Sequence, residues 1–202
     1  MKKLLVFAAL TCATSVQAQK VDTLASQELQ EVIVAGVRAQ KNAPFAVANI
    51  KKTELSNFSK TGRELPFLFA HTPGVFAWGD NGLGTGTTAM RIRGAGGSRI
   101  NITLDGVSLN SPEDQTVFWA NMNSYGALMS SVQIQRGIGT STNGDGAFGG
   151  SISLATATPN QQPSAEVSGS FGTYNTYNTG VKFSTGLLGS HFVFDGAYHE
   201  TA

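Results

Sequence analysis

The sequence predicts an α+β domain of short strands and helices followed by longer antiparallel strands, and three observations favour this fold class. Only 13% of the 202 residues are charged, against ~25% in typical soluble domains. Glycine occurs 24 times, well above the usual ~7% share. Alternating apolar and polar residues recur along the second half, as in strands with one buried face. With 41% hydrophobic residues and a formal charge of +1, the chain is neither a disordered polymer nor a strongly basic nucleic-acid binder.

Residues 1–18 have the pattern of a secretory signal peptide. Lys2 and Lys3 precede an apolar run, and residues 16–18 (VQA) form a small-residue cleavage site. Ten helical residues rise only ~15 Å, half of a ~30 Å hydrocarbon core, so the run does not span a bilayer. A buried N-terminal helix and acylation of Cys12 are the disfavoured alternatives. Removing the two lysines from 14 basic residues leaves 12 against 13 acidic, with no cysteine for a disulfide or thiolate metal site.

Residues 19–42 are predicted to be a flexible segment with one β-prone stretch. Residues 19–30 are polar and carry no folding signal, whereas residues 31–35 (EVIVA) are mostly apolar. So short a stretch cannot bury a core of its own. It can add as a strand to the sheet edge of another protein, or it can be the first strand of the domain that follows.

The next segment is predicted to alternate short helices and strands. A capping box at residues 61–64 predicts a helix that the His-Thr-Pro-Gly sequence at residues 71–74 ends. Period-2 alternation predicts strands at residues 89–94 and 99–104. Asp105 begins an Asp-Gly turn, and we interpret it as a turn former and not as an acid catalyst.

Two further strands are predicted at residues 131–136 (SVQIQR) and 151–155 (SISLA), joined by a glycine-rich stretch. A boundary with two prolines follows at residues 159–163, and beyond it the alternation extends over longer runs with aromatic residues near their ends. Such strands are typical of outer-membrane barrels. A soluble antiparallel sandwich gives the same alternation, so the pattern alone leaves both open.

Several motifs, in a fixed order, resemble those of TonB-dependent outer-membrane receptors. They are TPGV at 72–75, RIRG at 91–94, TLDGV at 103–107, VQIQRG at 132–137 and GDGAFGGSI at 144–152. EVIVA at 31–35 resembles the TonB box. The resemblance covers about residues 31–202. Gln135, where many members have an acidic or apolar residue, and Ser153-Leu154 in place of Asn-Ile are mild departures.

The resemblance implies an α+β plug domain, a small mixed sheet with short helices, inside a barrel of about 22 strands. The domains are then a signal peptide (1–18), a flexible segment (19–42) with the TonB box, a plug (43–158) and barrel strands (159–202). At ~10 residues a strand, the last 44 residues supply about three strands. We therefore expect the N-terminal part of a receptor, unable to transport alone, because open strand edges are unsatisfied in lipid.

The resemblance also implies site residues. The TonB-binding residues are Glu31, Val32, Ile33, Val34 and Ala35. Arg93 and Arg136, each followed by glycine, match paired plug arginines that dock on carboxylates of the barrel; the alternative is that they are solvated strand ends. By analogy, the loops 75–88 and 110–123 face outward. They would bring Trp78, Phe118 and Trp119 to a substrate, or else against the barrel.

The implied function is active uptake of a scarce nutrient across the outer membrane of a Gram-negative bacterium. The expected partners are TonB, which transmits energy from the inner membrane, the outer-membrane lipid around the full barrel, and a small-molecule substrate. A ferric siderophore is the leading substrate, with cobalamin, haem and glycans as alternatives. A soluble periplasmic binding module derived from a plug is the other function considered.

An enzyme is not expected, because none of the common catalytic motifs occurs in the sequence. The three histidines, His71, His191 and His199, have no partner at a metal-binding spacing. No cofactor, catalytic residue or metal ligand is therefore predicted.

Overall fold

The structure is a computed structural model, and it describes residues 38–39, 44, 46–138, 146–173, 176–189 and 192–201. The predicted signal peptide and the predicted TonB-binding residues 31–35 lie outside the described residues. In the part of the chain that the structure describes, no helix is both long and apolar enough to cross a membrane.

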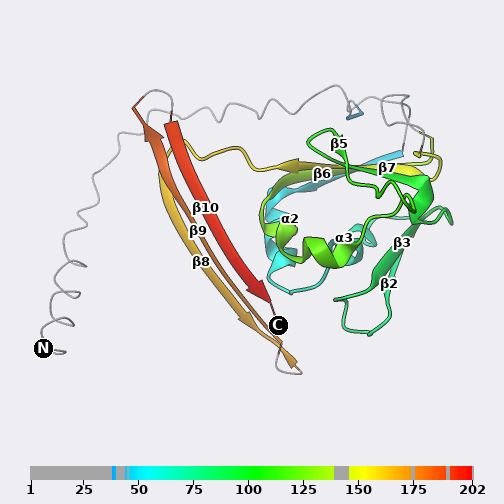
Figure 1. The fold of residues 1–202 in the computed structure, drawn as a ribbon, viewed down its shortest axis with the longest axis horizontal. Helices are drawn as coiled ribbons and strands as arrows, with labels where there is room; N and C mark the ends of the chain where they lie inside the picture. The colour runs from blue at the N-terminus through cyan, green and yellow to red at the C-terminus, as the bar shows by residue number, and fades with distance from the viewer. Residues whose placement is uncertain are drawn as a thin grey trace, which may run out of the picture. The chain divides into compact units, whose positions relative to one another are not determined.

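A five-stranded mixed sheet forms the centre of the first domain (Figure 1). Its strands are β1 (Ala46–Lys51), β4 (Ile100–Leu104), β5 (Val107–Ser108), β6 (Met129–Arg136) and β7 (Gly150–Thr156). The order is β1-β6-β7-β4-β5, and only β4 and β7 are parallel. The predicted mixed sheet is confirmed.

Four short helices accompany the sheet in the described residues. They are α2 (Lys52–Ser59), α3 (Leu65–Phe69) and the 3₁₀ helices η1 (Gly97–Arg99) and η2 (Trp119–Ala127). The helix predicted after residue 61 is α3, but its capping box does not form. The Thr61 hydroxyl donates to the Phe58 carbonyl, and the Glu64 carboxylate is buried and accepts from Thr88.

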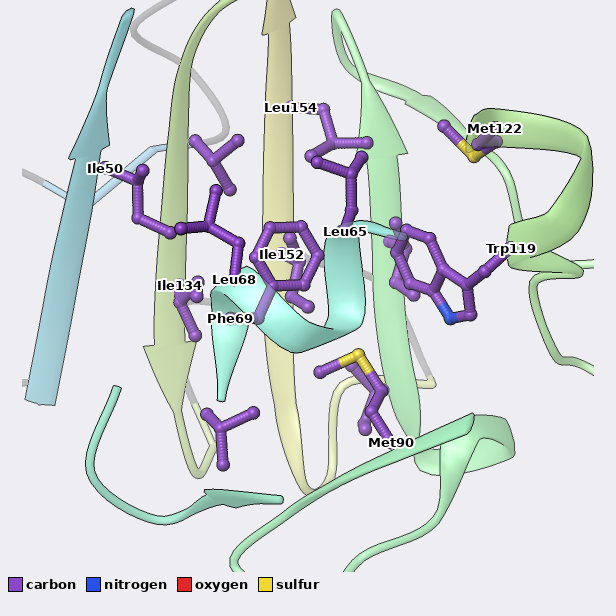
Figure 2. Packing of buried hydrophobic residues seen from close by; sticks show 14 of the residues in the cluster. Ile50, Leu65, Leu68, Phe69, Met90, Trp119, Met122, Ile134, Ile152 and Leu154 are labelled. Atoms are coloured by element: carbon purple, nitrogen blue, oxygen red, sulfur yellow. The ribbon is translucent and has the colours of Figure 1, made fainter. Parts of the chain in front are cut away.

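The alternation along β6 and β7 gives the sheet one apolar and one polar face. The buried apolar residues include Val132, Ile134, Ile152 and Leu154 from these strands and Leu65, Leu68, Phe69 and Trp119 from the helices. Figure 2 shows side chains of α3 and η2 converging on the apolar face. Phe69 and Trp119 meet edge to face, with ring centroids 5.6 Å apart. Full burial of one such side chain contributes roughly 2–3 kcal/mol.

Strands β2 (Val75–Gly79) and β3 (Thr88–Ile92) form a separate antiparallel hairpin. Val75, Met90 and Ile92 are buried in the core, whereas Phe76 and Arg91, paired across the two strands, are exposed. The hairpin therefore has one face in the core and one exposed face.

The C-terminal part is a three-stranded antiparallel sheet of consecutive strands (Figure 1). It contains β8 (Pro163–Phe171), β9 (Tyr177–Leu188) and β10 (Phe192–Thr201). Along β9, Val181 and Phe183 are 44% and 46% exposed, whereas Asn178 and Ser184 are buried. This arrangement confirms the predicted antiparallel strands with one apolar and one polar face.

Candidate functional site

Arg93 lies in a tight turn directly after β3. Its φ of 49° is in the left-handed region, which costs an L-residue roughly 1–2 kcal/mol. Backbone hydrogen bonds hold the turn: the Arg93 N–H donates to the Gly74 carbonyl over 2.8 Å, and Ile92 and Ala95 exchange two bonds. The side chain of Arg93 is exposed.

Arg136, the last residue of β6, reaches the same segment. Its Nη1 donates to the Pro73 carbonyl over 2.8 Å. Its Nε is buried and has no hydrogen-bond partner among the described residues. An unpaired buried donor is costly, so this N–H is suited to an acceptor supplied from outside the described residues.

The structure thus brings the two predicted arginines to one place, next to Pro73 and Gly74. Gly137 completes the arrangement: its φ is +89°, and a Cβ there would lie only 2.7 Å from Nη1 of Arg93. The positive φ favours glycine at this position, and the exposed Arg93 side chain packs against it. The described residues do not include the groups that the two arginines contact beyond this turn.

An aromatic and cationic cluster lies on the exposed face of the β2–β3 hairpin. Phe76 and Trp78 stack with ring centroids 5.8 Å apart and an interplanar angle of 25°. The guanidinium of Arg91 lies 5.4 Å from the Trp78 ring, within cation–π range. Phe76 and Arg91 were not predicted, although the i, i+2 spacing of Phe76 and Trp78 in one strand could have indicated their shared face.

The two predicted aromatic residues of the second loop separate. Phe118 is 60% exposed, whereas Trp119 is 3% exposed and packs on Phe69 in the core. This burial does not fit the predicted contact of Trp119 with a substrate, because almost the whole indole is covered by the core. Phe118 and Trp78 remain candidates.

The loop after Trp78 is tied to the start of α3. The Glu64 N–H donates to the Gly84 carbonyl over 2.9 Å, and its carboxylate accepts from the Thr88 hydroxyl. Within the loop, Asn81 Oδ1 accepts the Leu83 N–H over 2.9 Å. These bonds fix the loop before any ligand arrives, which lowers the ordering cost of binding.

The loop that precedes Phe118 is fixed in a similar way. The Asn110 side chain accepts from the Ile102 N–H over 2.8 Å and donates to the Gln115 carbonyl over 2.7 Å. Asp114 accepts from both the hydroxyl and the N–H of Thr116. These bonds to its charged form hold the pKa of the Asp114 carboxyl below its ordinary value.

The polar face of the C-terminal sheet contacts the first domain at two helix ends. Asn178 donates to the Ser59 carbonyl over 2.8 Å, and Lys182 donates to the Ala127 carbonyl over 2.6 Å. Ser59 ends α2 and Ala127 ends η2, where carbonyls have no partner within the helix. Lys182 also places a cation at the negative end of a helix dipole. Sequence reasoning did not find these residues, because neither carries a local signal of its distant partner.

Within the described ranges, no group of three or more His, Cys, Asp or Glu residues is placed to hold a metal ion. The site is therefore a set of docking and contact surfaces. It comprises the two arginines, the aromatic cluster and the capped helix ends.

These features define a class of protein: a mixed-sheet domain whose helix ends dock on the polar face of an amphipathic antiparallel sheet. The sequence profile of the TonB-dependent Receptor Plug Domain matches residues 39–151, which is more than half of the 202 residues. The chain belongs to this family. A search of curated proteins finds no match.

Solved structures with a similar fold include receptors from three bacteria. The ferric yersiniabactin uptake receptor FyuA from Yersinia pestis has 19% identity and a TM-score of 0.55, and the match covers 77% of this chain and 24% of that one. A variant of the ferric enterobactin receptor PfeA from Pseudomonas aeruginosa has 18% identity and a TM-score of 0.59, with 80% and 25% covered. The siderophore receptor PiuA from Acinetobacter baumannii has 17% identity and a TM-score of 0.59, with 83% and 22% covered. The chain spans about a quarter of their length, and at these identities the likeness is one of fold.

Proposed function

We propose that the chain is the N-terminal part of a TonB-dependent outer-membrane receptor that takes up a ferric siderophore. The observation that carries this proposal is the docking of a plug-family domain on a sheet whose opposite face is apolar. Asn178 and Lys182 face the plug, whereas Val181 and Phe183 are exposed on the same strand. In the proposed receptor, the apolar face meets lipid and the polar face lines the lumen.

The free edges of β8 and β10 support a larger barrel. Among the described residues, the outer edges of β8 and β10 have no ladder partner, and in lipid such backbone groups must be satisfied by neighbouring strands. We infer that further strands continue the sheet in the complete protein. A soluble periplasmic module is disfavoured, because side chains such as Val167 (80% exposed) and Phe171 (79%) would lie in water.

The arginine pair is proposed to hold the plug in the barrel. Arg93 is exposed, and Arg136 is partly exposed with one buried N–H that has no partner among the described residues. A carboxylate from the inner barrel surface would pair with the accessible part of these guanidinium groups through charge-assisted hydrogen bonds, which are strong and still reversible. Residues 31–35 are proposed to bind TonB by strand addition, and TonB supplies the energy for plug movement.

The substrate surface is proposed to comprise Phe76, Trp78, Arg91 and Phe118. Flat aromatic rings stack on aromatic or planar groups, and the guanidinium attracts an anionic ligand. The similar structures are a ferric yersiniabactin uptake receptor, a ferric enterobactin receptor and a siderophore receptor. A ferric siderophore is therefore proposed ahead of cobalamin, haem or a glycan.

Growth of a deletion strain on single nutrient sources tests the function. We expect loss of growth when a ferric siderophore is the only iron source, and recovery when the full-length gene is restored. Growth should be unchanged on haem iron, cobalamin or glycans. A defect on one of those sources alone would contradict the substrate assignment, and no defect on any of them would contradict the uptake function.

A further inference from the structure

The polar face of the plug sheet holds a short piece of the N-terminal segment. The guanidinium of Arg38 spans β6 and β7 with four hydrogen bonds. Nη1 donates to Ser131 Oγ over 2.8 Å, and Nε donates to Ser153 Oγ over 3.1 Å. Nη2 donates to the carbonyls of the same two serines over 3.1 and 2.9 Å. One side chain therefore bridges the second and third strands of the sheet.

Ala39 is held by a second, reciprocal pair of bonds. Its N–H donates to Gln133 Oε1 over 2.7 Å, and Gln133 Nε2 donates back to the Ala39 carbonyl over 3.1 Å. The amide of Gln133 thus pairs with the backbone as another strand would. Gln133 is only 5% exposed and also donates to Asn49 Oδ1 over 2.9 Å, so its orientation is fixed.

The sequence explains why this face accepts such a segment. Alternation along β6 and β7 puts Gln133 and Ser153 opposite each other, on the face away from the hydrophobic core. Buried polar side chains need hydrogen-bond partners, and Arg38 and Ala39 supply them. We call Arg38, Ala39, Ser131, Gln133 and Ser153 the clasp.

We propose that the clasp is the point at which force on the N-terminal segment enters the plug. This rests on the proposed function, which assigns residues 31–35 to TonB. Only two residues separate that stretch from Arg38, so even an extended chain spans about 10 Å between Ala35 and Arg38. A pull then loads β6 and β7, in the interior of the sheet, before it reaches the edge strand β1.

Among the described residues, the next paired element after the clasp is β1, which begins at Ala46 and pairs with β6 in antiparallel register. Without the clasp, the point of resistance would move eight residues along the chain. At ~3.5 Å per extended residue, this lengthens the free segment by about 28 Å. The two arrangements are therefore distinguishable by length as well as by force.

Single-molecule pulling on the N-terminus of the complete receptor in a lipid bilayer tests the proposal. For the wild type, we expect the first rupture at the contour length that ends at Arg38. The double variant Arg38→Ala with Gln133→Ala, which removes the bonds of Arg38 and those of Ala39, should move that rupture outward by about 28 Å. The double variant Ser131→Ala with Ser153→Ala, which leaves Arg38 in place, should lower the first rupture force. Arg63→Ala, which removes an exposed arginine stacked over Phe67 4.2 Å away, is the matched control and should leave the trace unchanged.

Identical first ruptures in the wild type and the Arg38→Ala, Gln133→Ala variant would overturn the proposal, and so would an equal shift in Arg63→Ala. If the Arg38→Ala, Gln133→Ala variant does not assemble, the double serine variant decides by its first rupture force, and an unchanged force overturns the proposal. The measurement needs neither TonB nor a substrate. A normal wild-type first rupture in a receptor that proves inactive in uptake would therefore refute the proposed function and leave the clasp standing.

Discussion

Gly150, the first residue of β7, shows how tightly single positions constrain the plug. A Cβ at this glycine would lie 2.5 Å from the Gln135 carbonyl oxygen and 3.1 Å from Cδ1 of Ile92. One side is backbone of the neighbouring strand and the other is a fully buried core residue. The Gln135 carbonyl cannot give way without separating β6 from β7, and Ile92 can move only by disturbing the core.

Gly150→Ala should therefore destabilise the plug by roughly 1–3 kcal/mol, the usual cost of overpacking. In the complete receptor, this would appear as faster cleavage of the plug by added protease. Gly146→Ala is the control, since a Cβ there meets nothing within 4 Å and no positive φ is involved. Equal protease sensitivity of the two variants would show that the β6–β7 contact is looser than in this structure.

The stacked pair on the β2–β3 hairpin leads to a prediction about substrate binding. Trp78→Ala removes both the stack with Phe76 and the cation–π contact of Arg91. A ligand ring stacked on Trp78 would contribute ~0.5–1.5 kcal/mol, so the Kd of the complete receptor for the proposed ferric siderophore should rise by roughly 2–12-fold. Equilibrium titration of the purified receptor measures this change.

Phe148→Ala is the matched control for Trp78→Ala, because Phe148 is another exposed plug aromatic (64%) outside the cluster. Its Kd should stay at the wild-type value. If Trp78→Ala binds normally, the aromatic cluster faces something other than the substrate.

At the scale of elements, the sequence predicts correctly those strands whose apolar and polar residues alternate locally. Residues 131–136 and 151–155 alternate cleanly, and both form strands, β6 and β7, with Ile134 and Ile152 inward. The predicted Asp-Gly turn at Asp105 is confirmed, since its φ is 49° and its carboxylate accepts from Thr156.

The features that sequence reasoning missed depend on distant partners or on segments without a period. The Glu64 side chain was assigned to a local cap, but it is bonded to Thr88, 24 residues away. Arg38 and its serines are 93 and 115 residues apart. Phe118 immediately precedes η2 and Trp119 begins it, so no regular alternation could indicate that only Trp119 is buried. Tertiary packing decides which of these side chains is buried and which partner each one bonds.

The capped helix ends give a prediction about plug docking. Asn178→Asp replaces an amide donor by a carboxylate, which only accepts and therefore faces the Ser59 carbonyl without a bond. We expect a loss of roughly 1–3 kcal/mol at this contact. A looser plug should admit more of a large hydrophilic antibiotic that the intact outer membrane excludes.

Thr179→Ala is the control for this experiment, because Thr179 is the next residue of β9 and is exposed on the opposite face. It should leave antibiotic sensitivity unchanged. If Asn178→Asp cells are as resistant as the wild type, other contacts alone hold the plug at α2.

At the scale of the whole molecule, the two faces of the β8–β10 sheet differ in polarity, so each face suits a different environment. Plug contacts come from Asn178 and Lys182, and the alternating residues between and beyond them carry the exposed apolar side chains. In the proposed receptor, water and the plug lie on the polar side of this sheet and lipid lies on the apolar side.

Val181→Arg tests this assignment directly. Val181 lies near the middle of β9, and a charged residue on the lipid face of a barrel costs ~2–4 kcal/mol at the bilayer midplane. We expect a strongly reduced amount of complete receptor in the outer membrane, measured by immunoblot of membrane fractions. Val181→Ala removes apolar area without adding charge and should reduce the amount much less. Equal amounts of the two variants would mean that this face meets protein or water, and that the strands do not line a membrane barrel in the proposed orientation.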